Sequence, residues 1–475
     1  MNEQANRYLE ETPITKLMLK FSIPCILSLL VSSLYNIVDQ IFIGHAVGYL
    51  GNGATNVVFP ITVIALAAAL MIGDGCAAFL SLCQGKNDQE SSHRSVGNAI
   101  VLFIAVSIVF LLVFYFGREG ILTVFGATEN NIEYARAYFD IILIGIPFYV
   151  FTNGINSVIR ADGSPQFAMI STLIGCILNV ILDPIALFVL GWGVEGAALA
   201  TIIGQIVSAV LGAGYLFHTK SFKLKKESFR LNFSIIGHFL PLGISSLLTQ
   251  LSIVVVMGVM NSTLVAYGAQ SRFGADIPMT VVGIVMKVFQ IVIAFVVGIA
   301  AGCQPIVGYN YGAGKTDRVK NIYRNMIIAE LAVGVIGTIA VEIFPMQLIG
   351  IFGSESDLYN EFAVYAFRIY LGTLILCCIQ KATSIFLQSL GRPVMSMSLS
   401  LLRDFILMVP LVLALPNIGG LGVMGPLFSA PIADVISIVA AALMIAAAFR
   451  QMNPADTKQK VTSAGKALKK GVSAV

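Results

Sequence analysis

Long apolar stretches alternate with short polar ones along almost the entire chain. Each apolar stretch holds about 20 or more residues, the length that a helix needs to cross the hydrocarbon core of a bilayer. The predicted spans are 17–44, 54–82, 95–117, 132–157, 165–190, 194–217, 235–261, 278–306, 321–343, 360–389, 395–416 and 422–449. This pattern predicts an all-α polytopic membrane protein with twelve transmembrane helices.

The spans fall into two halves whose sequences resemble each other. "RADGSPQFAM" (160–169) resembles "QSLGRPVMSM" (388–397), and "GVEGAALATIIGQIVS" (193–208) resembles "GVMGPLFSAPIADVIS" (422–437). Parallel repeats of this kind are typical of transporters whose halves move against each other around a central site. We therefore expect two pseudo-symmetric six-helix lobes. The expected divisions are an N-terminal lobe (1–217), a basic inter-lobe loop (218–234), a C-terminal lobe (235–450) and a basic tail (451–475).

The charged residues are few and unevenly distributed. They make up 11% of the chain, against 57% hydrophobic residues. Lys and Arg gather in the even-numbered loops, for example at Arg94, Arg160 and Lys220, and in the tail. By the positive-inside rule, both termini should be cytoplasmic in a multi-pass protein of the plasma membrane. The net charge of +4 lies in these loops and suggests no nucleic-acid partner.

Two carboxylates interrupt the apolar pattern of the first half. In "NVILDP", Asn179 and Asp183 lie one helical turn apart, and Pro184 should kink the helix. Asp39 lies deep in the first span, and Asp74 is a third acid with a weaker claim. A carboxylate in hydrocarbon costs about 2.5–3.5 kcal/mol, so it usually faces an internal cavity on an ion or substrate path. The alternative is a structural pair that bonds a neighbouring helix.

Further polar side chains of the first half could line a chamber around these acids, and apolar side chains of the second half could complete it. The candidates for the substrate cavity are Tyr35, Asn36, Asn153, Asn156, Gln205, Met257, Met260, Met286 and Phe289. Met and Phe walls adapt to substrates of varied shape. The positions of the second half that match Asp39, Asn179 and Asp183 are apolar, which predicts an acidic site specialised in the N-terminal lobe.

Lys287 and Asp434 are two charges within predicted spans of the second half. Their depths match by residue count, and an unpaired buried charge is costly. We expect them to form an ion pair, either structural or involved in gating.

The motifs of common enzyme classes are missing from the sequence. "GYNYGAGKT" (308–316) lacks the spacing of a phosphate-binding P-loop, and the four His show no HExxH spacing. No nucleophile elbow or metal cluster is visible. We therefore expect no enzymatic activity and no cofactor.

Several segments in order along the chain resemble one known family. They are "IPCILSLLVSSLYNIVDQIFIGH" (23–45), "RADGSPQ" (160–166), "LNVILDP" (178–184), "GVEGAALAT" (193–201) and "GYNYGAGK" (308–315). Together they resemble the MATE (multidrug and toxic compound extrusion) exporters, above all their MepA-like bacterial branch. The resemblance covers roughly residues 14–450.

This resemblance implies a V-shaped fold and antiport of cationic, amphipathic drugs or dyes against H⁺ or Na⁺. The matching coupling residues are Asp39, Asn179, Asp183 and Thr201, which would also be the ligands of Na⁺. Relatives of the NorM type carry a Glu in helix 7 and an Asp in helix 10. In this chain, the corresponding helices carry neutral residues in place of these acids, namely Thr249 and Gln250 in helix 7 and Cys378 and Gln380 in helix 10. Coupling through the N-terminal lobe is therefore favoured.

We expect H⁺ rather than Na⁺ as the coupling ion, and a monomer in the lipid bilayer. The alternative function is a lipid-linked oligosaccharide flippase of the same broad superfamily. That function calls for a cationic cavity, whereas the buried acids predict an acidic one.

Overall fold

The computed structural model describes residues 8–127, 129, 131–350 and 356–452. All regular secondary structure in these residues is helical. Eleven helices are long and apolar enough to cross a membrane, and a bent pair brings the number of spans to twelve among the described residues. The prediction of an all-α polytopic protein with twelve spans is confirmed, while most of the tail (453–475) lies outside the described residues.

The first half of the chain contains six spans. They are α2 (Ile14–Ala46), α3 (Tyr49–Gly85), α4 (Gln89–Val124), α5 (Ile132–Ala161), α6 (Pro165–Pro184) with the π-helix η1 (Ile185–Val189), and α7 (Gly193–Tyr215). The short 3₁₀-helix η2 (Lys226–Phe229) lies in the connection to the second half.

The second half supplies the other six spans. They are α8 (Phe233–Gly268), α9 (Asp276–Gly312), α10 (Thr316–Ile343), the bent pair α12 (Asp357–Leu371) and α13 (Leu374–Ser389), the segment α14 (Pro393–Leu401), η3 (Leu402–Leu407), α15 (Met408–Ala414) and η4 (Leu415–Asn417), and finally η5 (Gly422–Phe428) with α16 (Ser429–Met452). The short helix α11 (Pro345–Gly350) connects α10 to α12.

The predicted kink at Pro184 takes the form of a change in helix type. Proline lacks the backbone N–H that would continue the α-helical hydrogen bonds. The chain does not break there but continues as the wider π-helix η1. Single-turn π-helices occur often at functional sites, and this one begins two residues after Asp183.

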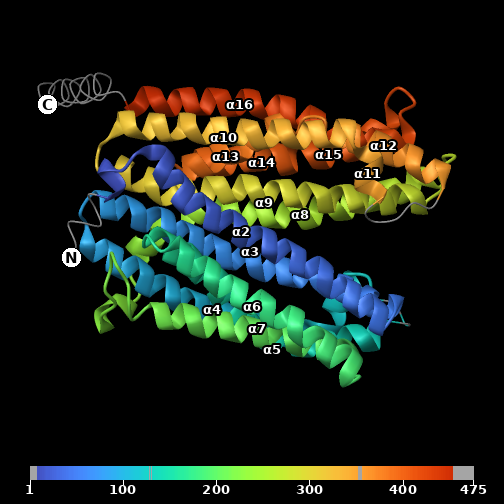
Figure 1. The fold of residues 1–475 in the computed structure, drawn as a ribbon, viewed down its shortest axis with the longest axis horizontal. Helices are drawn as coiled ribbons and strands as arrows, with labels where there is room; N and C mark the ends of the chain where they lie inside the picture. Colours follow the sequence, from blue (N-terminus) through green and yellow to red (C-terminus); the bar gives the residue numbers. More distant parts are fainter. Residues whose placement is uncertain (1–7, 128, 130, 351–355, 453–475) are drawn as a thin grey trace, which may run out of the picture.

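The two halves form two lobes that meet along α2, α3, α8 and α9. In Figure 1, α2–α7 lie in the lower lobe and α8–α16 in the upper one. The lobes lie close together at the left, where α2 begins and α16 ends, which we call the terminal end. They diverge toward the right, which we call the open end. The result is a V shape, as expected.

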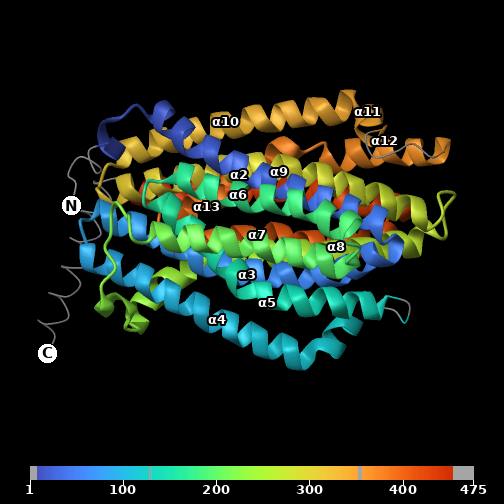
Figure 2. The ribbon, with the colours of Figure 1, turned by 60° about the horizontal axis from the view of Figure 1, so that its bottom comes forward.

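The outer helices carry large apolar side chains on their exposed faces. Figure 2 shows α4 at one edge of the molecule and α10 at the opposite edge. Ile104 and Leu112 of α4, Ile336 of α10 and Leu443 of α16 are all more than half exposed. Apolar surface on this scale is suited to lipid and not to water.

Glycines allow the lobes to approach closely near the terminal end. A Cβ built on Gly243 of α8 would lie 1.7 Å from the carbonyl oxygen of Met71 in α3. A Cβ on Gly85 of α3 would lie 2.1 Å from the carbonyl oxygen of Tyr309 in α9. Backbone atoms therefore touch across the interface, and no larger residue fits at these positions without a shift of the helices.

We expect Gly243→Ala to lower the stability of the packed lobes by about 1–3 kcal/mol, because the added methyl overpacks a backbone contact. Gly237→Ala is the matched control in the same helix, since nothing lies within 4 Å of its added methyl. Thermal unfolding in detergent compares the two variants. Equal melting temperatures would contradict the close packing of α3 on α8.

The connection between the lobes is bound to the N-terminal lobe by buried polar groups. Asn98 of α4 donates to the carbonyl oxygens of Ser228 and Arg230, both at 3.1 Å. Asp162 accepts hydrogen bonds from the Tyr215 hydroxyl (2.6 Å) and the Lys220 backbone N–H (2.8 Å). Burial raises the pKa of the Asp162 carboxyl despite these bonds. The linker is thus an ordered part of the terminal end.

The described segment before α2 is anchored to the C-terminal lobe. The Glu10 carboxylate pairs with Lys315 and accepts a hydrogen bond from the Tyr309 hydroxyl at 3.0 Å. The hydrogen bond from Lys315 holds the pKa of Glu10 below its usual value. This contact connects the segment before α2 to the ends of α9 and α10, so it adds to lobe contact at the terminal end.

Candidate ion and substrate site

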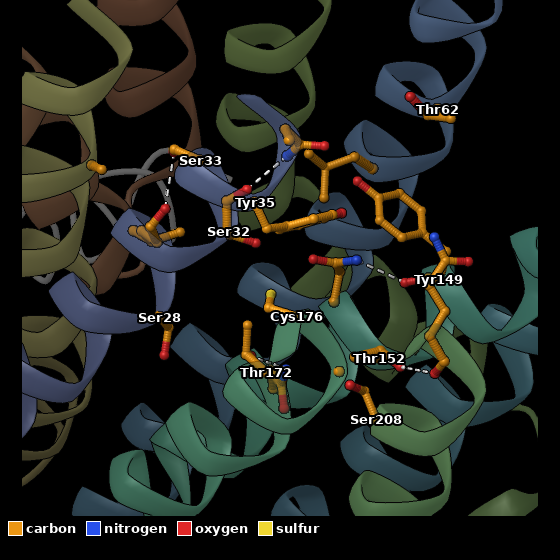
Figure 3. A pocket seen from close by; sticks show the side chains of 18 of the residues that line it. Ser28, Ser32, Ser33, Tyr35, Thr62, Tyr149, Thr152, Thr172, Cys176 and Ser208 are labelled. Carbon is orange, nitrogen blue, oxygen red and sulfur yellow. Dashed lines mark hydrogen bonds between the residues drawn. The ribbon is translucent and has the colours of Figure 1, made fainter. Parts of the chain in front are cut away.

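A cavity of about 380 Å³ lies between the lobes. Most of its wall belongs to α2, α3, α5, α6 and α7 of the N-terminal lobe, and the rest belongs to α8 and α9. Figure 3 shows Ser32, Tyr35, Tyr149, Thr152 and Cys176 around this space. The wall is rich in neutral hydroxyl and amide groups, which can bond varied substrates without fixing one orientation.

Two carboxylates lie behind this wall in the N-terminal lobe. Asp39 of α2 is 8% exposed and Asp183 of α6 is 0% exposed. Their carboxyl groups lie within hydrogen-bonding reach of each other. The Asn179 amide donates to Asp183 Oδ1 (3.1 Å) and to Thr201 Oγ1 (3.2 Å). The four predicted coupling residues therefore form one cluster, and Asn179 and Thr201 also line the cavity.

Several buried oxygens of the cluster have no donor among the residues that the structure describes. These are Asp39 Oδ1, Asp183 Oδ2 and Asn179 Oδ1. Buried polar atoms nearly always have a partner, and two carboxylates in contact cannot both stay charged without compensation. A shared proton would supply the missing partner. A small hard cation also fits, because all the free groups are oxygen ligands.

The predicted cavity residues of the N-terminal lobe are in place. Tyr35, Asn36, Asn153, Asn156 and Gln205 all line the cavity. They come from α2, α5 and α7, so helices far apart in the sequence contribute to one wall.

The predicted apolar wall of the C-terminal lobe is wrong in its residues. Met260 and Phe289 belong to the core of that lobe, where Met260 is buried and Phe289 packs edge-on against Tyr370. Met257 and Met286 are also absent from the lining. They lie one turn toward the open end from Ile253 and Gln290, which do line it. The cavity ends before that turn.

Comparison with known sequences identifies the family. The MatE family model matches residues 24–185 and 244–413, which lie in the first and second half respectively. The chain belongs to the MatE family. The members of this family are transporters, and the resemblance seen in the sequence is confirmed.

Curated relatives within this family match almost the whole chain. The multidrug export protein MepA of Staphylococcus aureus strain MSSA476 is 25% identical over 450 residues, which cover 94% of this chain and 96% of the relative. The protein of the same name from Staphylococcus saprophyticus is 24% identical with the same coverage.

Solved MATE structures share the fold. A crystal structure of MATE in complex with MaL6 and an outward-facing conformation of a multidrug resistance MATE family transporter both have a TM-score of 0.87 at 22% identity. Each match covers 95% of this chain and 99% of the other. A transporter from Pyrococcus furiosus, described by the reverse polarity of its binding pocket, has a TM-score of 0.88 at 22% identity with the same coverage.

The polarity of the cavity in this MatE protein differs from the expectation. Its lining contains one charged residue, Arg160, and no carboxylate among the described residues. Arg160 was expected in a loop but forms the last turn of α5. It donates to the Ser157 hydroxyl (2.8 Å) and lies 3.8 Å from Asp74. The acids are recessed behind Asn179, so the cavity surface itself is not acidic.

Asp74 connects the two lobes on the side of the cavity that faces the terminal end. It accepts hydrogen bonds from Ser157 of α5 (2.6 Å) and from Ser246 of α8 (2.8 Å). Gln388 of α13 donates to the same Ser246 hydroxyl at 3.3 Å. The third acid is thus a contact between lobes and takes no part in the Asp39–Asp183 cluster.

The expected ion pair between Lys287 and Asp434 is not formed. Asp434 of α16 instead accepts hydrogen bonds from Arg403 Nε (2.8 Å) and from the Thr373 hydroxyl (2.7 Å). Arg403 also donates a hydrogen bond to Asp404 (2.8 Å), and Asp404 accepts a second one from Lys381 (2.6 Å). Four buried charges of balanced sign thereby join α13, η3 and α16. Thr373 lies where the α12–α13 span bends by 42°.

This network was not predicted from the sequence. Lys381, Arg403 and Asp404 were visible as charges within apolar spans, as was Glu330 of α10, whose two buried oxygens have no donor among the described residues. Charges at such depth are the signal that could have identified them. Their partners depend on how three helices pack, which the spacing along one helix does not reveal.

Proposed function

We propose that this protein is a multidrug exporter that exchanges amphipathic, cationic compounds for H⁺. The observation that carries the proposal is the pair Asp39 and Asp183, two buried carboxyls in mutual hydrogen-bonding reach behind a cavity between two lobes. Titratable groups in this position commonly mark ion pathways in transporters. The names of the MepA relatives, at 25% identity, support drug export.

The residues would act by alternating access between two arrangements of the lobes. We place the terminal end in the cytoplasm, so the described state opens outward. Proton uptake by the pair Asp39 and Asp183 lowers the negative charge behind the cavity. A cationic substrate is then held less strongly and leaves. When the lobes open inward, the proton is released and the restored charge attracts the next cation.

The geometry of the pair favours H⁺ over Na⁺. A hydrogen bond between two carboxyls forms only when one of them carries a proton, and it needs no further ligand. A sodium ion would need Asn179 Oδ1 and Thr201 Oγ1 as further ligands. Asn179 Oδ1 has no donor among the described residues, and Thr201 Oγ1 accepts one hydrogen bond, so the same site would serve under the sodium alternative.

The second candidate function is the export of a lipid-linked oligosaccharide. The specific observation in its favour is Arg160, a cation in the cavity wall that could approach a phosphate group. Its guanidinium is already engaged by Ser157 and lies near Asp74. One partly neutralised Arg is a weak pyrophosphate site, so we favour drug export.

Transport by the purified protein in proteoliposomes tests the proposal. We expect export of a fluorescent organic cation to follow an imposed pH gradient and to ignore an imposed sodium gradient. Export that follows the sodium gradient would show that Na⁺ is the coupling ion, while the proposed site would stay the same. Export under neither gradient would reject drug antiport and call for lipid-linked substrates.

A further inference from the structure

Lys287 is a cation within the membrane-spanning part of α9 that lacks a counter-charge. It is half-buried, and no hydrogen bond or ion pair joins its ammonium group to the described residues. Its expected partner, Asp434, is fully engaged by Arg403 and Thr373. An unpaired ammonium at this depth is costly unless it faces water. Lys287 therefore has no evident structural role.

The helix face on which Lys287 lies is the face that lines the cavity. Gln290 and Ala294 of this face line the cavity, and they follow Lys287 at the i+3 and i+7 positions. Lys287 thus lies about one helical turn beyond Gln290 of the cavity lining, toward the open end where the lobes diverge in Figure 1.

The packing of α9 on α2 determines which residue of the N-terminal lobe lies at the same height along the molecule as Lys287. Gly302 packs on Ser22 and Gly298 on Ile26, so the helices are antiparallel. Continued toward the open end, this register brings Lys287 level with Asn36. Asn36 is exposed and lines the cavity. Lys287 therefore stands at the entrance to the cavity, opposite its polar wall.

We propose that Lys287 is a specificity-determining residue at the cavity entrance, which binds the acidic group of those substrates that carry a carboxylate. The cavity lining contains Arg160 and no carboxylate among the described residues. A carboxylate that enters the cavity therefore meets the ammonium group of Lys287 and no acid of the described lining. The positive part of a zwitterion can at the same time point toward the recessed Asp39 and Asp183. This inference rests on the proposed function, because it names a residue that selects substrates of the same cavity.

Rhodamine B and its ethyl ester provide the test, because they share one fluorophore and differ in the free carboxylate. Fluorescence anisotropy with the purified full chain in detergent measures the affinity for each dye. We expect the wild type to bind both dyes. Lys287→Gln should weaken binding of the acid by about tenfold, the effect of losing one charge-assisted contact. Binding of the ester should stay unchanged.

Two further variants sharpen this test. Lys287→Arg keeps the charge and should retain affinity for the acid. Lys223→Gln removes an equal charge from the exposed inter-lobe loop and should affect neither dye. Equal losses for both dyes in Lys287→Gln, no loss for either, or a wild type that binds only the ester would each overturn the proposal. Failure of ion-driven export with the acid-selective loss intact would reject the coupling mechanism alone.

Discussion

Asp183→Asn is expected to abolish ion-driven export of a cationic dye. Exchange of one proton for one monovalent cation could sustain a substrate gradient of roughly tenfold for each unit of pH difference, about 1.4 kcal/mol, and the variant should hold no gradient at all. The introduced amide would still accept a hydrogen bond from Asn179, as the carboxylate of Asp183 does, so the fold should persist. The amide cannot take up or release a proton, so the site loses the change of charge that drives the cycle.

Asp39→Asn should have the same effect, because the proton is shared by the two carboxyls. The double variant should be no worse than either single one. Asp140→Asn is the matched control, since Asp140 is a carboxylate of the same lobe that pairs with Arg118 outside the site. Normal export by Asp183→Asn at a normal expression level would remove the carboxyl pair from the mechanism.

Arg403→Leu should destabilise the C-terminal lobe by about 3–5 kcal/mol, because it leaves buried acids without a partner. Among the described residues, the side chain of Asp434 would then keep the Thr373 hydroxyl as its sole partner, and that of Asp404 would keep Lys381. The seven cysteines are all buried, so a thiol-reactive fluorophore reports unfolding directly. The melting temperature in detergent should fall well below that of the wild type.

A surface pair and a neutral double variant separate this effect from general damage. Arg368 pairs with Glu342 at the surface, both about half exposed, so Arg368→Leu should cost at most about 1 kcal/mol. The double variant Arg403→Met with Asp434→Leu removes both charges of one pair and should melt above either single variant. Additive losses in the double variant would contradict the network.

The helices were predictable because their signal is local. An apolar run of the right length identifies a span without knowledge of its neighbours. Asp39 and Asp183 were predictable for a related reason, since an acid within an apolar span must face something other than lipid. Asn179 followed from its helical spacing to Asp183, and Thr201 from the family resemblance.

The parts that depend on packing were not predictable from spacing. Lys287 and Asp434 matched in depth, but the partner of Asp434 is set by the approach of η3 to α16, which places Arg403 next to it. Met260 lies on a helix that also contributes to the cavity, yet it faces the lobe core. Arg160 was assigned to a loop because the end of α5 could not be fixed to within one turn.

The release of protons on substrate binding tests the central claim most directly. Tetraphenylphosphonium, a permanent cation with no titratable group, is added to the purified protein in weakly buffered detergent solution with a pH indicator. We predict that the wild type releases protons on binding and that the Asp39→Asn, Asp183→Asn double variant binds without release. No release by the wild type, or equal release by the double variant, would contradict the exchange of substrate for a proton at this pair.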